Sequence, residues 1–450
     1  MSSISQYLTL YTDNREAINS HSSELLNSGR EVAYAFLQDK QLPEKGEEGF
    51  EKTSIEEMFA PDYGLNINRI NIPVDVAASF KCDVPNVTTL LGVVVNDMFV
   101  PTATLLKNIP EGVTVMSLAK AAKEMPEEVA KYFGKVAPGD NVNVALNTLL
   151  VQDGVFIKIA KGVKVEKPIQ IVNIFNTPAP AMAIRRVLIA AEEDSSANVL
   201  FCDHTQTPNM QYLSSEVVEV YMEANSHIDI CGIEESSAQT NRYSQIFVKQ
   251  TDGSQLYINS STLLNGKTRN DFTIDISGQH CETYLTGIAI AAGDGIVDNN
   301  SNVNHLAPRS HSNQLFKYLV DDKAQGAFEG GIYVSKDAPF TEGYQSNSNI
   351  LATGTARMHS KPQLLIYNDE VKCSHGASTG QLDENALFYM QQRGIPKSMA
   401  RTLLMQAFMS EVIDTIPVEG IKDRMRHLVE KRLSGDYMLC GTCQSDCHKQ

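Results

Sequence analysis

A long series of short β-strands between about Gly154 and Ala377 constrains the fold of this chain more than any other feature. In GVFIKIAKGVKVEKPIQIVNIF, which begins the series, Val155, Ile157 and Ile159 fall on one face of an extended chain. This two-residue period is typical of β-strands, and helical periodicity is nearly absent over about 200 residues. Turns rich in Gly, Asn, Asp and Ser separate the strands. The strands predicted after this segment are Arg186–Ala190, Ala197–Cys202, Val217–Met222, His227–Ile230, Arg242–Lys249, Gln255–Ile258, Asp271–Ile276, Glu282–Ile290, Gln314–Leu319, Gly326–Val334 and Asn349–Ala352.

Two architectures fit such a series: a pair of sandwiches or barrels, and an irregular β-solenoid. No strict sequence repeat is evident. Hairpin signals are scarce, and Asn265-Gly266 is the one clear candidate for a tight turn between paired strands. This scarcity favours the solenoid, because its strands pair with strands of neighbouring turns instead of with the next strand in sequence.

Helical patterns lie on both sides of the strand series. Residues 1 to about 42 are predicted to be helical, and residues 88–150 mix short strands with helical pieces. Asp383 is a good N-cap for a helix that ends at Arg393-Gly394, and two further helices are predicted, one opening at Pro396 and one running to about Leu433. We expect these last helices to cover the open end of the solenoid. The predicted divisions are a mostly helical or mixed domain (1–150), the strand-rich core (151–377), a helical domain (378–435) and a Cys-rich tail (436–450).

The composition limits the classes of partner. The net charge of −16 argues against a nucleic-acid partner, which requires a basic face. The most apolar stretches, near Leu90–Val95 and Leu285–Ala292, are too short to span a bilayer. The N-terminus lacks the basic start and apolar run of a signal peptide, so we expect a cytoplasmic protein whose scattered cysteines are reduced.

The stretch Val371–Ile395 carries the candidate chemistry. Cys373 and His375 lie two residues apart in a predicted strand, so both side chains project from the same face. Gly376 and Gly380 are expected to end the strand. A thiol and an imidazole are both metal ligands. On residue type alone, however, Cys373 fits a packed core group and His375 a structural histidine equally well.

The motifs of this stretch resemble the SufB/SufD family of iron–sulfur cluster assembly proteins. They are C-S-H-G-A at residues 373–377, G-x-L-D at 380–383 and L-F-Y-x-x-x-R-G-I at 387–395. The SufB branch has C-E-H-E-A where this chain has Ser374 and Gly376, so the resemblance is closer to SufD. It extends upstream through Gln345-Ser346-Asn347 and Lys361-Pro362-Gln363-Leu364. The N-terminal part departs from the family pattern because this chain has no Trp.

The resemblance implies a mainly β protein, in which helical domains flank a right-handed parallel β-helix. It implies a non-enzymatic subunit of a cytosolic iron–sulfur cluster assembly scaffold. This subunit would pair with a SufB-like subunit through its last strands and bind a SufC-like ATPase through its C-terminal helices. A homodimer is one candidate state of the isolated chain, which the sequence leaves open. His375 and Cys373 would lie at the subunit interface, with the imidazole as the main ligand. No cofactor is expected to bind the isolated chain tightly; iron or a cluster would be transient in the complex.

The tail is a second candidate metal site. Cys440, Cys443, Cys447 and His448 form C-x2-C-x3-C-H, and these thiolate and imidazole donors suit zinc or an iron–sulfur cluster. The alternative is a terminal segment with reactive thiols and no metal.

Other functions and motifs fit less well. A β-helix enzyme acting on polysaccharide would use Trp platforms and an acidic or basic catalytic cluster, which are not evident, and a plain interaction scaffold with a zinc-binding tail is a third possibility. Gly266-Lys267-Thr268 lacks the first glycine of a phosphate-binding loop. His305 and His311 flank a Pro-Arg loop and are interpreted as structural or surface histidines.

Overall fold

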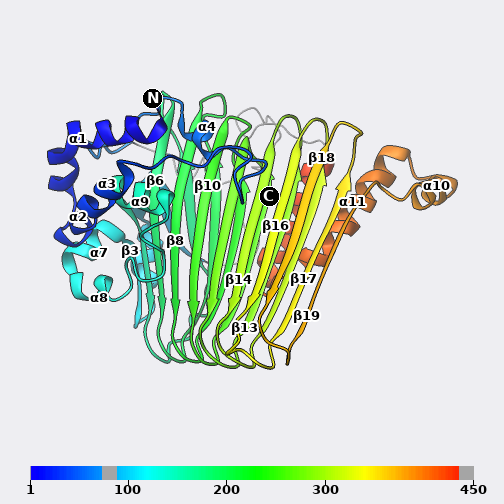
Figure 1. Cartoon of the computed structure of the whole chain (residues 1–450). Helices are drawn as coiled ribbons and strands as arrows, with labels where there is room; N and C mark the ends of the chain where they lie inside the picture. Colours follow the sequence, from blue (N-terminus) through cyan, green and yellow to red (C-terminus); the bar gives the residue numbers. More distant parts are fainter. Residues whose placement is uncertain (1, 73–88, 435–450) are drawn as a thin grey trace.

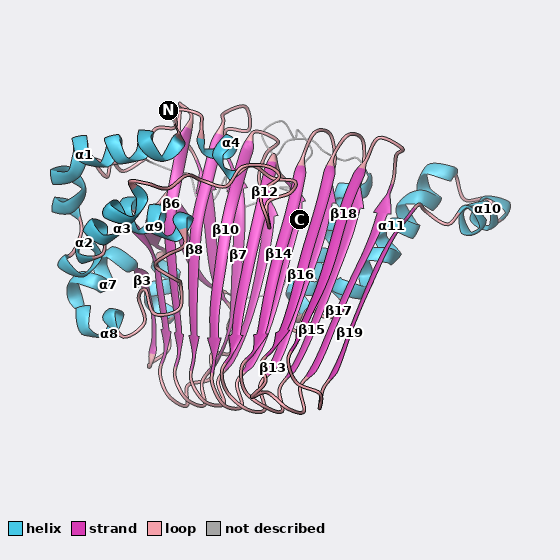
Figure 2. Ribbon diagram, in the orientation of Figure 1, coloured by secondary structure: helices cyan, strands magenta, loops and turns pink. Residues whose placement is uncertain are grey.

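Two long sheets dominate the computed structural model, which describes residues 2–72 and 89–434 (Figures 1 and 2). In sheet A the strand order is β18-β16-β14-β12-β10-β8-β6-β4-β3, and in sheet B it is β19-β17-β15-β13-β11-β9-β7-β5-β1-β2. Consecutive strands from β4 onward therefore alternate between the sheets. These strands are β4 Asp153–Ile159, β5 Ile169–Phe175, β6 Ala181–Ala191, β7 Ser196–Thr205, β8 Tyr212–Met222, β9 His227–Glu235, β10 Thr240–Gln250, β11 Gln255–Leu264, β12 Lys267–Ile276, β13 Glu282–Ala291, β14 Ile296–His305, β15 His311–Val320, β16 Gln325–Val334, β17 Glu342–Leu351, β18 Arg357–Ile366 and β19 Lys372–Gly380.

The strands from β4 to β19 form a β-solenoid of about eight turns, each contributing one strand to each sheet. Every strand from β6 to β17 pairs in parallel with the strands one turn before and one turn after it, as β12 does with β10 and β14. The predicted solenoid is confirmed, and the pair of sandwiches is excluded. Apolar side chains from both sheets fill the interior, among them Val155, Ile157 and Ile159 as predicted.

The hairpin predicted at Asn265-Gly266 is wrong. The flanking strands β11 and β12 belong to different sheets, so this segment is a corner of the solenoid. Gly266 is required for a different reason: a Cβ atom there would lie 2.8 Å from the carbonyl oxygen of Ala238 and 2.9 Å from that of Thr240, both in the preceding turn.

The N-terminal end of the solenoid is plugged. Strand β1 (Leu90–Val95) pairs in parallel with β5 and antiparallel with β2 (Met98–Pro101), while β3 (Val113–Ser117) pairs antiparallel with β4. Phe99, Leu105 and Val113 join the interior apolar cluster from these segments. The helices that gather around this end in Figure 1 are α1 Ser3–His21, α2 Glu24–Ser28, α3 Arg30–Leu37, α7 Leu118–Glu124, α8 Pro126–Ala130 and α9 Val142–Leu150. Helix α4 (Ile55–Phe59) lies nearer the middle of the molecule, and α6 (Ala103–Asn108) packs on β1.

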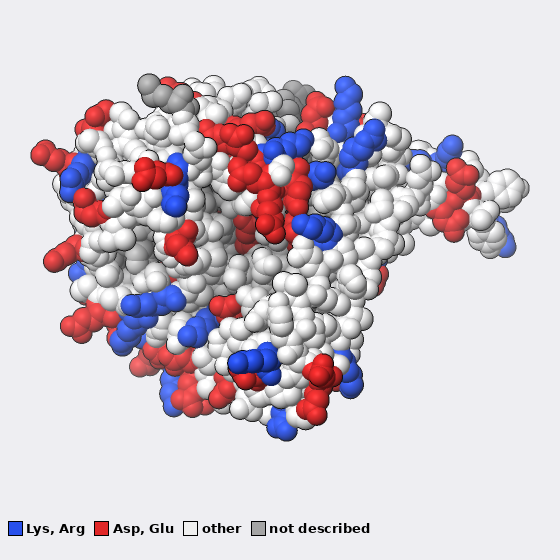
Figure 3. All heavy atoms as spheres, in the orientation of Figure 1, with Lys and Arg blue, Asp and Glu red and all other residues white. Residues whose placement is uncertain are grey.

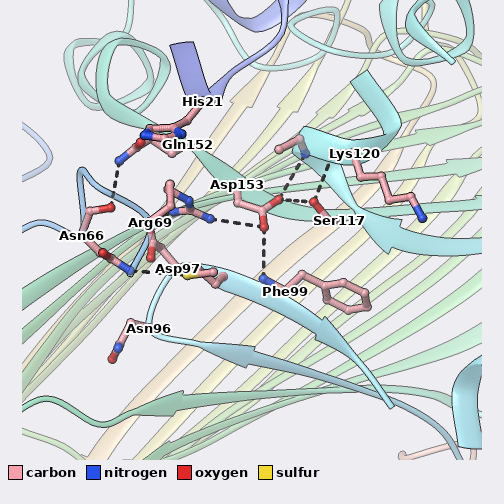
Figure 4. A network of polar contacts seen from close by, with 12 residues as sticks. His21, Asn66, Arg69, Asn96, Asp97, Phe99, Ser117, Lys120, Gln152 and Asp153 are labelled. Atoms are coloured by element: carbon pink, nitrogen blue, oxygen red, sulfur yellow. Dashed lines mark hydrogen bonds and ion pairs between the residues drawn. The ribbon is translucent and has the colours of Figure 1, made fainter. Parts of the chain in front are cut away.

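A polar network centred on Asp153 holds this plug together (Figure 4). One carboxylate oxygen accepts hydrogen bonds from the Ser117 hydroxyl (2.7 Å) and the Ala119 amide (3.1 Å). The other accepts from the Phe99 amide (3.1 Å) and pairs with Arg69 (3.5 Å). Asp153 begins the first solenoid strand, so one buried side chain connects β4 to β2, α7 and the segment that precedes β1.

Three helices follow the last strand, as the capping signals predict: α10 Glu384–Gln392, α11 Lys397–Ile413 and α12 Glu419–Ser434. Asp383 accepts hydrogen bonds from the amides of Asn385 and Ala386, and Gly394 after α10 has a φ of 87°.

The expected position of these helices is wrong. Helix α11 packs on β13 and β15, and α12 on β11, so they cover the outer face of sheet B and leave the end of the solenoid open. Apolar side chains of both helices join those of sheet B in one buried cluster, and Figure 1 shows α10 projecting beyond the last turn. Within the described residues, none of the helices is both long enough and apolar enough to cross a membrane.

Candidate functional site

The last turn of the solenoid is open because β18 and β19 are the edge strands of sheets A and B. Every residue of β18 is partly or fully exposed, and β19 is exposed at all positions except the half-buried Cys373. An edge of this kind presents unpaired backbone N–H and C=O groups together with the inward-facing side chains of the final turn. At such an edge, the strands of another chain are able to continue both sheets.

Cys373 and His375 both face the interior side of this open turn. Strand β19 runs in unbroken register with β17, which sets Cys373 beside Gly343 and His375 beside Gln345. Cys373 packs against the interior cluster around Ile332, so His375, two residues on, points the same way. The shared face is confirmed. The expected end of the strand at Gly376 is wrong, since β19 continues to Gly380.

The two side chains differ in accessibility. His375 is exposed and Cys373 is half-buried. Burial raises the pKa of the Cys373 thiol, only partly offset by a hydrogen bond from the Gly343 backbone. The thiol is therefore protonated at neutral pH and is a poor ligand until a metal displaces its proton. The accessible imidazole is the better first donor of the pair.

A layer of buried polar side chains lies directly behind these residues. Gln345 and Asn347 of β17 are 3% and 1% exposed, and the Asn347 side-chain oxygen accepts a hydrogen bond of 2.7 Å from Ser360 of β18. In the sequence, Gln345 stood out only as part of the motif Gln345-Ser346-Asn347 that carries the family resemblance. The signal that could have found its role is its spacing of 30 residues from His375, one turn of the solenoid.

The rim of the open end is apolar. Leu365, Ile366 and Tyr367, at the end of β18 and just after it, are 50%, 38% and 61% exposed. Figure 3 shows a largely uncharged surface over the lower part of the last strands, while Lys and Arg side chains lie toward their upper ends and acidic side chains gather further toward the middle of this face. Exposed apolar side chains beside an unpaired strand edge are typical of a protein interface.

The other sequence candidates lie elsewhere. His305 is fully buried and its Nε2 is 2.8 Å from the Ser312 hydroxyl, while the ring of His311 lies between those of Tyr284 and Tyr344. Both histidines pack against neighbouring side chains, in agreement with their interpretation as structural or surface residues.

The predicted tail site, Cys440, Cys443, Cys447 and His448, lies outside the described residues. In the part that is described, no three His, Cys, Asp or Glu side chains are grouped to hold a metal ion. Cys231, Cys281 and Cys373, in the same part of the chain, are free thiols.

A separate cavity of about 370 Å³ lies on the outer face of sheet B, next to the loop between α11 and α12. His227 and Asp229 form a 2.9 Å contact at its edge, and Tyr257 and Tyr284 line it. Asp229 raises the pKa of His227. The cavity is remote in sequence and in sheet position from His375.

Family models and known relatives each match most of the chain. A family model described as "SUF system FeS cluster assembly, SufBD core domain" matches residues 173–408, and one described as "SufBD protein N-terminal region" matches residues 1–171. An iron–sulfur cluster assembly SufBD family protein of Synechocystis sp. is 27% identical over 91% of each chain. The iron–sulfur cluster assembly protein SufD of Escherichia coli is 26% identical over 64% of this chain and 69% of its own. SufD of Bacillus subtilis is 26% identical over 72% of this chain and 74% of its own.

Proposed function

The chain belongs to the SufBD family of iron–sulfur cluster assembly proteins, and from this premise we propose that it is the SufD-like subunit of a scaffold complex. In this proposal the subunit is cytoplasmic, is not itself an enzyme, and winds as a right-handed β-helix. Nascent clusters pass through the complex as cargo and are not a resident cofactor of this chain. The relatives named SufD support this reading over a polysaccharide-acting enzyme.

The observation that carries the proposal is the open edge at β18 and β19. A SufB-like subunit adds its own edge strands there, which pairs the free backbone groups and covers the exposed Leu365 and Tyr367. In the isolated chain, a second copy takes the same place and gives a homodimer.

Docking at this edge creates a sheltered metal site. His375 supplies a neutral imidazole at the interface, and cysteine or carboxylate side chains of the SufB-like partner complete the ligand set. Cys373 lies on the same face, but its half-buried thiol packs against apolar side chains and contributes less. A site between two edges shields a nascent cluster from water and opens when the edges separate.

The C-terminal helices are proposed to hold the SufC-like ATPase. Phe388 and Tyr389 of α10 and Met399 and Leu403 of α11 are large and exposed, at 62%, 58%, 57% and 42%. Met409, in contrast, is fully buried and is core. Deletion of these helices would also uncover sheet B, so the sharper test is a Phe388→Ser/Tyr389→Ser variant. It should lose co-purification with the ATPase, with an unchanged far-ultraviolet circular dichroism spectrum; retained binding would contradict this assignment.

The central test is His375→Ala, measured in a complex co-expressed with its SufB-like and SufC-like neighbours under anaerobic conditions. We expect the complex to assemble while iron and acid-labile sulfide per complex fall severalfold. Because the side chain is exposed, the free energy of unfolding should change by no more than about 0.5 kcal/mol.

Cys373→Ser is the matched comparison on the same strand face. We expect a smaller loss of cluster, because the imidazole is the main donor. If His375→Ala instead unfolds the chain or prevents assembly, while surviving complexes carry normal iron and sulfide, then His375 is structural and the ligand assignment is wrong.

The tail is proposed to bind metal separately from the scaffold role. Cys440, Cys443, Cys447 and His448 offer the donors of a tetrahedral zinc site. Cobalt substitution should give thiolate charge-transfer absorption that disappears in a Cys440→Ser/Cys443→Ser variant. An identical metal content in the two proteins would show that the tail binds none.

A further inference from the structure

The side-chain amide of Gln345 is held in one orientation by a chain of hydrogen bonds that begins at a backbone carbonyl. The Gly331 carbonyl oxygen can only accept, and the Gln314 side-chain nitrogen donates to it at 3.3 Å. The Gln314 side-chain oxygen is therefore turned the other way. It accepts from the Ser301 hydroxyl at 2.6 Å and from the Gln345 nitrogen at 3.2 Å. Reversing the Gln345 amide would set two oxygens against each other, so its orientation is determined by the network.

Glycine at position 330 leaves room for this amide. A Cβ atom on Gly330 would lie 2.2 Å from the Gln345 nitrogen and 2.7 Å from its carbonyl carbon. The amide thus crosses the interior and lies against the backbone of β16. Any larger residue at position 330 would displace it.

The other end of the amide has no partner. Its nitrogen donates to Gln314 in the preceding turn, so the Gln345 oxygen is the end of the amide that Gln314 does not use. It is buried and accepts no hydrogen bond within the described residues. An unpaired buried acceptor is unfavourable unless another group uses it, so it indicates a place where a donor is expected.

The donor in register is His375. It sits beside Gln345 on the neighbouring strand and on the same interior face, at the strand separation of about 4.8 Å. The imidazole is exposed and able to rotate about its side-chain torsions. In proteins, a metal-binding histidine usually donates its second ring N–H to an acceptor, which selects the tautomer and orients the ring.

We propose that Gln345 is the positioning residue for His375. Its side-chain oxygen accepts the N–H of the imidazole, selects one tautomer and leaves the opposite ring nitrogen free to bind iron at the open edge. This inference rests on the proposed role of His375 and extends it to a buried network that reaches back through Gln314 to Ser301.

The test reads the tautomer directly. The full chain is labelled with ¹⁵N-histidine, and the His375 ring signals are assigned by their disappearance in His375→Ala. Ring ¹⁵N shifts are recorded at a pH where the imidazole is neutral. Gln345→Met keeps the volume but removes the carbonyl oxygen, and we expect it to change the tautomer ratio at least threefold.

One variant serves as a control. Ser360→Ala alters another interior residue of the last turn, one that bonds Asn347 and not Gln345, and should leave the ratio unchanged. An unchanged ratio in Gln345→Met would overturn the proposal, as would an equal change in Ser360→Ala.

A second measurement separates this inference from the proposed function. In the anaerobically assembled complex, Gln345→Met should lower iron retention severalfold, no more than His375→Ala does, with no further loss when the two changes are combined. If His375→Ala itself leaves iron unchanged, the cluster role fails while the tautomer measurement still decides the hydrogen bond. If Gln345→Met shifts the tautomer but iron retention is normal in a complex that needs His375, the positioning role is wrong.

Discussion

At the scale of single residues, buried titratable groups inside the solenoid make its stability depend on pH. His305 is fully buried, and burial together with the nearby His311 lowers its pKa from 6.5 to about 4. Because the folded state binds the proton less readily than the unfolded state, His305 destabilises the fold as the pH decreases from about 6.5 toward 4. Glu234 acts in the opposite sense. Burial raises its pKa from 4.5 to about 7, so Glu234 destabilises the fold as the pH rises from about 4.5 toward 7.

Comparison with His305→Gln isolates the histidine from the other groups. Between pH 7 and pH 5, the free energy of unfolding of the wild type should fall by about 2 kcal/mol more than that of the variant. Urea unfolding at the two pH values measures this difference. Equal losses in the two proteins would mean that His305 is protonated inside the fold.

Residue-level chemistry was only partly predictable from the sequence. The two-residue spacing of Cys373 and His375 was sufficient to place both on one strand face. Nothing in the local sequence distinguished the accessible imidazole from the half-buried thiol, because that difference depends on Ile332 and Gly343 from the preceding turn. The placement of Gln345 beside His375 likewise depends on a strand register that a single sequence does not display.

At the scale of elements, the corners that join consecutive strands determine which strands pair. The strand register repeats every 29 residues from Lys267 to Ile296 to Gln325, but the next step, from Gln325 to Arg357, is 32 residues long. Corners of unequal length hide the repeat from sequence inspection. The same variation explains the wrong hairpin at Asn265-Gly266, where a dipeptide typical of tight turns lies at a corner.

Two corner glycines should therefore respond differently to substitution. Gly266→Ala should destabilise the fold by roughly 1–3 kcal/mol, because its methyl group meets two carbonyl oxygens of the turn below. Gly293 has a φ of 64° and open space around it, so Gly293→Asn should cost less than about 1 kcal/mol. Urea unfolding of both variants measures these costs, and a larger cost for Gly293→Asn would contradict the stacking explanation.

At the scale of the whole molecule, the helices were predictable but their placement was not. The caps at Asp383 and Pro396 are local signals, and the structure confirms them. Which surface α11 and α12 cover depends on tertiary contacts. Lys317 of β15, nearly buried, donates to the Phe408 carbonyl at 2.9 Å and lies 4.3 Å above the Phe408 ring, which ties α11 to the face of sheet B.

The uncovered edge should govern self-association of the isolated chain. Leu365→Glu/Tyr367→Glu places charge on the apolar rim without touching the core, so the free energy of unfolding should change little. The dissociation constant of the homodimer should rise at least tenfold in sedimentation equilibrium. As a control, Val32→Glu alters a side chain that is 72% exposed near the plugged end and should leave association unchanged. If both variants weaken association equally, the contact lies elsewhere.

The plug built by β2, β3 and α6 has a consequence for polymerisation. A solenoid that is open at both ends is able to grow into a fibre, because each added copy exposes a new open end to which the next copy binds. With Phe99 and Leu105 filling one end, each copy has a single reactive terminus. Two copies paired as proposed at these termini would leave no open end, so growth would stop at the pair and the subunit would not seed filaments.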